Sequence, residues 1–200
     1  KYENILRSKI RVIKEINDTT SLKVRNQYED SPYPRWVNLN LPNRSYEVSQ
    51  IIFYLKLKLI SKTICNLKKP NILIAGCGTG QHSIETAGRF KESKVLAIDL
   101  SLSSLSYAMR KTIELGIKNI DYVQADILDI VSLEKKFDIV ESVGVLHHMK
   151  NPIKGWKALT GCLKSGGLMR IGLYSELARK EIALIREDNS PISHSLSKND

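Results

Sequence analysis

The residues best suited to chemistry in this chain lie in and beside one glycine-rich turn. Ile72 to Ala75 form an apolar run of strand length, and Gly76-Cys77-Gly78-Thr79-Gly80 follows it. Glycines let the backbone turn tightly and let a ligand approach main-chain atoms that a Cβ would shield. A helix predicted over 83–90 would direct unpaired N–H groups and its positive dipole end at this turn. The pattern therefore predicts a nucleotide-type binding loop.

Acidic residues close the next two predicted strands. Asp99 ends the strand predicted over 94–98, and Asp126 follows the strand predicted over 119–124. Asp99 lies 19 residues after Gly80, where a carboxylate typically accepts hydrogen bonds from both ribose hydroxyls. Asp126 is placed to pair with an exocyclic amine such as adenine N6. For each acid the alternative is a cap on the following turn, a role that Asp fills well.

These side chains need a scaffold that brings strand ends together. After residue 70, short apolar segments alternate with helical ones, which indicates an α/β protein with a doubly wound, mainly parallel sheet. In such sheets ligands bind beyond the carboxyl ends of the strands. The predicted strands cover 71–75, 94–98, 119–124, 137–143 and 168–173. The predicted helices cover 83–90, 102–115, 153–163 and 176–186, with a turn at 165–167.

The residues before this sheet predict an N-terminal extension. Apolar residues at helical spacing predict one helix over 1–24, which Asn17 to Thr20 would end, and another over 43–68, capped at Asn43 or Ser45. Between them Gln27 to Trp36 contains two prolines and three aromatic residues, so it either covers a core edge or lines a site. We predict a helix and lid segment over 1–44, a catalytic domain over 45–187 and a flexible tail over 188–200.

Two ligands suit an acid that holds a ribose: a dinucleotide such as NAD, and S-adenosylmethionine. The dinucleotide fingerprint is GxGxxG, but here Gln81 occupies the place of its third glycine. A phosphate-binding P-loop is excluded because no Lys-Ser/Thr pair follows the glycines. The spacing favours S-adenosylmethionine.

Further motifs strengthen this interpretation. Ala-Gly-Cys-Gly-Thr-Gly at 75–80, Asp99, Gln124-Ala125-Asp126, Phe137 to Val140 and Val145 to Met149 occur in the order found in class I S-adenosylmethionine-dependent methyltransferases, which the chain resembles over 71–174. Leu163 to Gly167 resembles their Leu-Lys-Pro-Gly-Gly turn, with Ser165 in place of proline. Gln27 to Glu29 and Pro32 to Trp36 resemble a bacterial subgroup in which tetratricopeptide repeats precede the methyltransferase domain, so we expect an upstream helical repeat region in the full-length chain.

The resemblance implies a role for ten residues. Gly76, Cys77, Gly78 and Gly80 would pass under the methionine part of the cofactor. Asp99 would hold the ribose diol with Leu100 beside the adenine, while Asp126 would take the adenine amine and Ile127 would offer backbone contacts. Ser142 and Val143 would face the sulfonium and the substrate.

Three features depart from the family or stay open. The family often has an acid two positions before the first glycine, where this chain has Ile74, so we expect another segment to supply that polar group. Nothing after Leu173 predicts the family's final two strands. The catalytic base is unassigned: His147 and His148 are candidates, and the alternative is that one packs and the other bonds to the loop.

Composition and charge limit the class of acceptor and the cellular compartment. The net charge is +10, but the lysines are scattered without aromatic interleaving, so we favour a protein or small-molecule acceptor over RNA. No apolar run is long enough to span a membrane. Three widely spaced cysteines without metal-ligand spacing suit a reducing compartment, so we expect a cytoplasmic protein without a metal. The first residue is Lys1, and we expect a piece of a longer chain.

The function predicted from the sequence is methyl transfer from S-adenosylmethionine to an acceptor that the sequence does not identify. One alternative is a non-catalytic, methyltransferase-like module that binds a partner through residues 1–36. A less favoured alternative is an NAD-dependent oxidoreductase, which would use the same ribose acid with a different glycine spacing.

Overall fold

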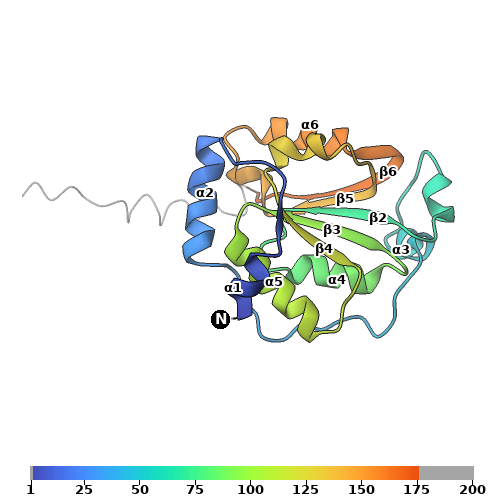
Figure 1. The fold of residues 1–200 in the computed structure, drawn as a ribbon. Helices are drawn as coiled ribbons and strands as arrows, with labels where there is room; N and C mark the ends of the chain where they lie inside the picture. Colours follow the sequence, from blue (N-terminus) through green and yellow to red (C-terminus); the bar gives the residue numbers. More distant parts are fainter. Residues whose placement is uncertain (1, 176–200) are drawn as a thin grey trace, which may run out of the picture.

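A computed structural model describes residues 2–175, and it contains one six-stranded sheet (Figure 1). Every strand pairing in the sheet is parallel, and the strand order is β1-β4-β3-β2-β5-β6. The predicted doubly wound parallel sheet is therefore confirmed. The strands are β1 (Arg11–Val12), β2 (Asn71–Ala75), β3 (Lys94–Asp99), β4 (Ile120–Gln124), β5 (Phe137–Val143) and β6 (Leu163–Gly172).

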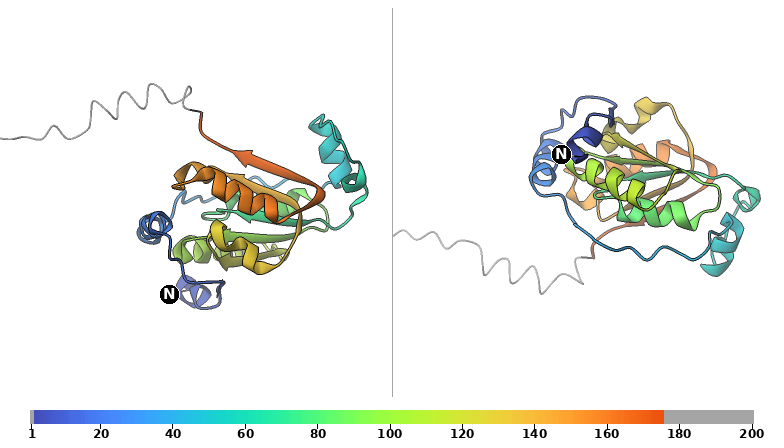
Figure 2. Two further views of the ribbon diagram at one scale, coloured as in Figure 1. Left: turned by 90° about the horizontal axis from the view of Figure 1, so that it is seen from above. Right: turned by 60° about the horizontal axis from the view of Figure 1, so that its bottom comes forward.

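Helices cover both faces of the sheet (Figures 1 and 2). On one face Ile72 and Ile74 of β2 pack in a core with Leu105 of α5, and on the other Leu73 packs with Leu159 of α6. Because the central strands are buried on both faces, they read as continuous apolar runs rather than alternating ones. The helical segments are α1 (Tyr2–Arg7), α2 (Thr19–Asp30), α3 (Val48–Tyr54), η1 (Thr63–Asn66), α4 (Gln81–Arg89), α5 (Leu102–Glu114), η2 (Ile127–Leu133), η3 (Leu146–His148) and α6 (Pro152–Gly161).

The strand order reverses at β2. From β2 the chain adds β3 and β4 on one side, and then returns to add β5 and β6 on the other. The connections leaving the carboxyl ends of β2 and β5 therefore diverge, which opens a crevice at that end of the sheet. Helix α2 lies across this end in Figure 1, while α3 lies at the opposite end.

The prediction of one helix over 1–24 is wrong. The chain instead forms α1, the short edge strand β1 beside β4, and α2. The polar residues expected to end a helix begin one, because the Asp18 carboxylate accepts a hydrogen bond from Ser21 N at 2.9 Å and caps α2.

The prediction of one helix over 43–68 is also wrong. Helix α3 is only seven residues long, and Glu47 caps it through a reciprocal exchange with Gln50 rather than Asn43 or Ser45. Lys56 has a positive φ of 52°, a conformation that ends the helix. Of the apolar stripe that predicted a continuous helix, Ile52 and Ile64 are buried, whereas Leu55 and Ile60 are 56% and 109% accessible.

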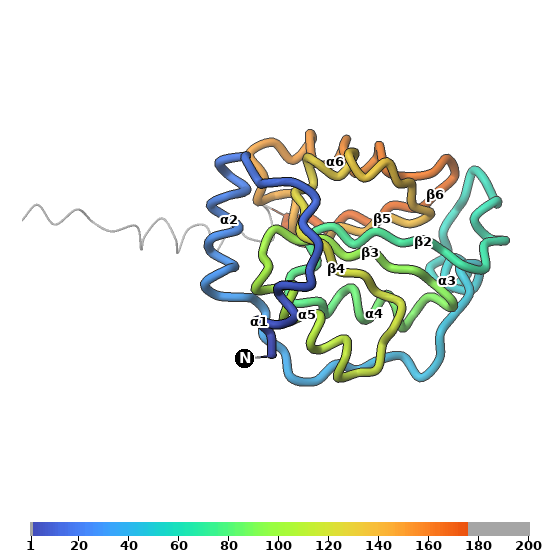
Figure 3. The backbone as a smooth tube through the Cα atoms, viewed as in Figure 1, coloured from blue at the N-terminus to red at the C-terminus, as the bar shows by residue number. Residues whose placement is uncertain are grey.

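Residues 31–47 run from α2 to α3 along the outside of the helical layer (Figure 3). Trp36 packs edge-on against Tyr107 of α5. Tyr46 N donates to Arg89 O at the end of α4, at 2.7 Å. The segment therefore connects the two ends of the sheet while it remains attached to α4 and α5.

The turn predicted at 165–167 lies within β6 as an irregularity. Leu163 pairs with Phe137, whereas Leu168 pairs with Ile139, so the intervening residues bulge out of register. Gly166 supplies the positive φ of 75° that such a bulge needs. The helix predicted over 176–186, the tail at 188–200 and any strands after Leu173 fall partly or wholly outside the described residues, and the predicted domain limits stay predictions.

Candidate binding site at the carboxyl ends of the strands

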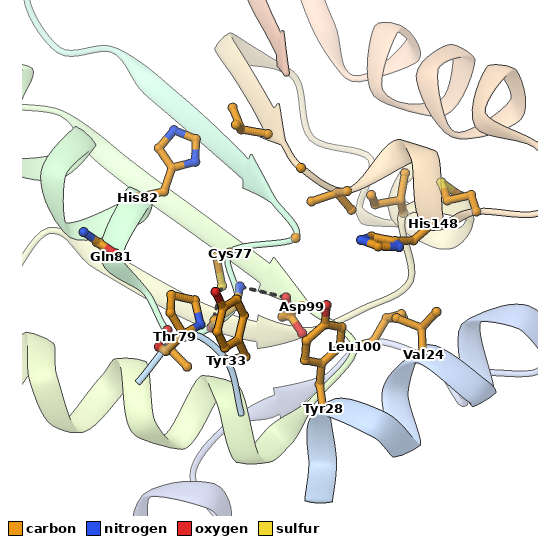
Figure 4. A pocket seen from close by; sticks show the side chains of 18 of the residues that line it. Val24, Tyr28, Tyr33, Cys77, Thr79, Gln81, His82, Asp99, Leu100 and His148 are labelled. Carbon is orange, nitrogen blue, oxygen red and sulfur yellow. Dashed lines mark hydrogen bonds between the residues drawn. The ribbon is translucent and has the colours of Figure 1, made fainter. Parts of the chain in front are cut away.

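A cavity of about 480 Å³ lies where the strand order reverses. Four parts of the chain surround it: the glycine loop, the ends of β3 to β6, the first turns of α4 and the N-terminal segment from α2 to Pro34 (Figure 4). Eight of the ten residues predicted to bind the cofactor line this cavity: Gly76, Cys77, Gly78, Asp99, Leu100, Asp126, Ile127 and Val143.

The glycine loop is fixed to the neighbouring strand by its backbone. Gly76 N and Cys77 N both donate to Ile98 O, at 2.8 and 3.0 Å. Gly76 has a φ of +75°, and a Cβ built on it would lie 2.4 Å from the Cγ2 atom of Val145. The loop therefore requires glycine here both for its conformation and for the close approach of the segment after β5.

Asp99 joins the glycine loop to the end of β3. Its Oδ2 accepts a hydrogen bond from Gly78 N at 2.8 Å, and its Oδ1 accepts one from Ser101 N at 3.0 Å (Figure 4). The N-cap of α5 is Ser101, so Asp99 does not fill that alternative role. Burial raises the pKa of Asp99, and the N–H groups of Ser101 and Gly78 offset part of this increase. Each carboxylate oxygen can accept a further bond from a ligand.

Asp126 combines the two roles that the sequence left open. Its Oδ1 accepts a hydrogen bond from Leu128 N at 2.9 Å, so it caps the short helix η2. It also lines the cavity, with Leu100 and Ile127 beside it. Within the described residues its Oδ2 accepts no hydrogen bond, so one acceptor remains for a ligand in the cavity.

Two of the predicted residues lie elsewhere. Ser142 was expected to face the ligand, but it is fully buried and its hydroxyl donates to Ala75 O at 3.0 Å. Gly80 is the N-cap of α4 and packs against α5, since a Cβ on it would lie 2.6 Å from Ala108 Cβ. Gly80 therefore sets how closely α4 and α5 approach, and Val143 is the residue of its strand end that reaches the cavity.

Cys77 behaves as a small residue in a crowded loop. It is 5% exposed, and its Sγ donates to Gly78 O at 3.7 Å. Burial raises the pKa of the thiol well above its ordinary value, with a further contribution from the Asp99 charge. A thiol held neutral in this way is a poor nucleophile, so the geometry gives Cys77 no covalent role.

The two histidines after β5 have different surroundings. His148 lines the cavity, whereas His147 does not. The His147 ring lies against the rings of His148 and Tyr174, with centroids 4.1 and 4.2 Å apart. His148 is therefore the one of the pair that a ligand can reach.

The N-terminal segment both covers a core edge and lines the site, the two roles that sequence analysis left open for 27–36. Tyr28, Tyr33 and Pro34 line the cavity, and both tyrosines lie beside Asp99 in Figure 4. Trp36 is buried, and its Nε1 donates to Thr79 O in the glycine loop at 3.1 Å. The Thr79 hydroxyl in turn donates to Pro34 O at 2.5 Å. These hydrogen bonds connect the N-terminal segment to the glycine loop.

The sequence placed Glu141 among the polar residues that close the strands, but sequence reasoning missed its partners at this site. His82 and Arg170 line the cavity, and the buried carboxylate of Glu141 contacts both. A single acid within the apolar segment Phe137 to Val143, together with the histidine after the glycine loop, was the available signal.

Two other kinds of site find no support in the described part of the chain. Residues 2–175 contain no group of three or more His, Cys, Asp or Glu side chains that could hold a metal ion. Among the helices that the structure describes, none has the length and apolar character needed to cross a bilayer.

Comparison with known proteins relates part of the chain to a known domain family. Residues 72–167 match the family model described as a methyltransferase domain. An uncharacterized protein from Synechococcus is 36% identical over 122 residues, which are 60% of this chain and 29% of that protein. A probable (S)-tetrahydroprotoberberine N-methyltransferase from Papaver bracteatum is 31% identical over 40% of this chain and 22% of its own length. The chain thus spans less than a third of either relative.

Solved structures agree on the fold. An S-adenosylmethionine-dependent methyltransferase from Clostridium acetobutylicum has a TM-score of 0.54 at 23% identity, covering 67% of this chain and 51% of that one. A protein that converts a disulfide bond into a thioacetal group during echinomycin biosynthesis has a TM-score of 0.57 at 22% identity, covering 82% and 62%. The cyclase SpnF has a TM-score of 0.54 at 20% identity, covering 79% and 61%.

Proposed function

We propose that this chain transfers a methyl group from S-adenosylmethionine to an acceptor molecule, because residues 72–167 match a methyltransferase domain model and the fold is similar to that of an S-adenosylmethionine-dependent methyltransferase. S-adenosylmethionine is the cofactor of this domain family. The assignment of individual residues to the cofactor, the acceptor and the activity of the whole protein belong to the proposal.

The position of Asp99 carries the proposal. Its carboxylate is bonded to Gly78 N of the glycine loop and lies at the carboxyl end of β3, on the cavity wall. A ribose diol placed there can donate to the carboxylate while the rest of the ligand crosses the loop. Asp126, Leu100 and Ile127 then provide a polar acceptor and an apolar surface of the kind an adenine ring needs. The residues present fit the cofactor.

The geometry favours S-adenosylmethionine over NAD. In a dinucleotide site the pyrophosphate lies against the N-terminus of the helix after the loop, where a third glycine lets that helix pack closely on the strand. Here Gln81 occupies the place of this glycine, begins α4 and lines the cavity. The dinucleotide fingerprint is therefore incomplete in this loop.

Methyl transfer requires alignment and exclusion of water more than it requires an acid. When bound, the cofactor supplies a methyl group on a positively charged sulfur. Around this position the chain offers Val143, Gly144 and Val145, while Tyr28 and Tyr33 cover the loop from the N-terminal side. These residues would orient the cofactor and keep water from the reacting atoms.

One observation argues against the non-catalytic module. In that alternative residues 1–36 bind a partner, but here this segment is folded onto its own domain. Glu29 accepts hydrogen bonds from Leu102 N at 2.5 Å and from the Ser103 hydroxyl at 2.7 Å. Arg7 bonds to the same carboxylate at 2.7 Å. The segment is thus attached to α5, and its residues Tyr28, Tyr33 and Pro34 line the cavity, which favours a role in the site over partner binding.

We propose a protein or small-molecule acceptor in preference to RNA, and a reducing, cytoplasmic setting in which the three free cysteines stay reduced. Upstream tetratricopeptide repeats are also a proposal. It is supported by the resemblance of Gln27 to Trp36 to the fused subgroup.

The test is binding followed by transfer. Calorimetry with S-adenosylmethionine and with NAD should show heat for the first ligand only. Cell extract incubated with labelled S-adenosylmethionine and the protein should then yield a labelled acceptor, identified by mass spectrometry, and Asp99→Asn should reduce the labelling at cofactor concentrations below saturation. Binding of NAD without S-adenosylmethionine would contradict the cofactor, and binding without any labelled product would contradict the catalytic role.

A further inference from the structure

A row of three residues crosses the sheet at the depth of the glycine loop. Ile74 of β2 is in register with Glu141 of β5, and Glu141 is in register with Arg170 of β6. Neighbours in register on parallel strands point to the same face. That face is the one covered by α4, since Ile74 and Ile139 belong to the same core as Ala87.

Glu141 is the centre of a polar cluster on this face. His82 Nε2 lies 2.5 Å from Glu141 Oε2, and the Thr86 hydroxyl donates to the same oxygen at 3.1 Å. Arg170 Nη1 is 3.9 Å away. Burial alone would raise the pKa of Glu141, but the hydrogen bond and charge of His82, helped by Arg170 and Thr86, bring it below its ordinary value. The carboxylate is therefore held in its charged form.

In this cluster the donors His82 and Arg170 face the cavity, whereas the acid, Glu141, is buried behind them. The Glu141 side chain is only 5% exposed and does not line the cavity. His82 and Arg170 do line it, with side chains 22% and 55% exposed. His82 is the second residue of α4, so it lies directly beyond the glycine loop and well apart from His148 in Figure 4. This wall of the cavity suits an anionic group.

We propose that His82 and Arg170, positioned by Glu141, bind the carboxylate of the amino-acid part of S-adenosylmethionine. The inference rests on the proposed function. The inference also accounts for Ile74, where an acid was expected. At this depth the acid is Glu141 on the neighbouring strand, and it contributes to binding by positioning His82 and Arg170. A donor pair suits the carboxylate better than the amine, because Glu141 Oε2 already accepts two hydrogen bonds.

The test compares two ligands that differ only in this carboxylate. Calorimetry of the wild-type chain should show S-adenosylmethionine binding at least about tenfold more tightly than decarboxylated S-adenosylmethionine, the scale of a lost charge-assisted hydrogen bond. Arg170→Gln and His82→Phe should each weaken S-adenosylmethionine by about tenfold and change the decarboxylated ligand less than about twofold. Glu141→Gln should weaken S-adenosylmethionine in the same selective way.

Arg11→Gln is the matched control, because Arg11 is exposed on the edge strand β1, does not line the cavity, and its loss removes the same charge. It should leave both affinities within about twofold, as expected when no direct contact is lost. Equal wild-type affinity for the two ligands would overturn the inference, and so would variants that weaken both ligands equally, since that result indicates a structural role. Failure to bind both S-adenosylmethionine and 5′-methylthioadenosine would instead overturn the proposed function.

Discussion

Replacing Asp99 with Asn should separate cofactor binding from stability. The carboxylate accepts backbone hydrogen bonds on both oxygens, from Gly78 N and Ser101 N. An Asn amide can satisfy only one of them, because its NH₂ group faces the other N–H. That mismatch costs about 1–3 kcal/mol. Burial already raises the pKa of Asp99, so loss of the buried charge offsets part of the cost, and we expect the free energy of unfolding to fall by about 1 kcal/mol.

Cofactor binding has no such compensation. A ribose diol donates to the charged carboxylate, and loss of a charge-assisted bond should lower the affinity for S-adenosylmethionine at least tenfold, about 1.4 kcal/mol. Calorimetry measures the affinity, and urea denaturation of the ligand-free protein measures stability. Asp129→Asn is the control, because that side chain pairs with Lys14 and does not line the cavity. Unchanged affinity in Asp99→Asn would refute the ribose assignment.

Three further substitutions probe the supports of the site. Trp36→Phe should cost about 1 kcal/mol of stability and weaken S-adenosylmethionine several-fold, because it removes the bond to Thr79 O; calorimetry and denaturation should show no such change for Trp156→Phe on α6. Gly80→Ala should destabilise by about 1–3 kcal/mol more than Gly116→Ala, since both have positive φ but only Gly80 faces a clash, and equal losses in denaturation would contradict this. Glu141→Gln should reduce the pH dependence of stability: the lowered pKa of Glu141 contributes stability above its unfolded value of 4.5, which is lost as pH falls through the folded pKa. Denaturation at roughly pH 7 and pH 3 should therefore show a larger acid loss for wild type than for the variant.

The strands from β2 to β5 were predictable because the central sheet is buried on both faces. Such strands are mostly apolar, and β2 and β3 end where glycine or an acid appears, at Gly76 and Asp99. Since parallel strands share one carboxyl edge, the order of these endings was sufficient to predict eight of the residues that line the cavity. Sequence therefore specified which strand ends meet.

Continuous apolar strands carry no information about which face a side chain occupies. Ser142 and Val143 follow the same buried run, and only the structure shows that Ser142 bonds to Ala75 O while Val143 reaches the cavity. Alternation along the strand decides this, and alternation is visible in a sequence only when one face is polar. The prediction for Ser142 is wrong by one residue, because adjacent residues of a strand point in opposite directions.

The prediction for the N-terminal segment was wrong for a different reason. Asp18 is equally suited to follow one helix or to cap the next, and local sequence does not distinguish these roles. The position of α2 instead depends on Glu29, whose partners Leu102 and Ser103 are more than 70 residues away in the chain. Contacts over such separations leave no periodicity in the segment itself, so its place over the cavity required the fold.

The same reasoning explains how a glycine loop without its usual acid can remain polar around its ligand. Residue 74 and residue 141 are distant in the chain but adjacent in the sheet, and both point toward α4. With Ile at residue 74 and the acid at residue 141, the charge lies one strand away from the usual position but at the same depth in the sheet. The buried charge then needs a new partner, which His82 supplies from the first turn of α4. In this chain the acid expected near the start of the glycine loop is thus found at the same depth on the neighbouring strand, at Glu141.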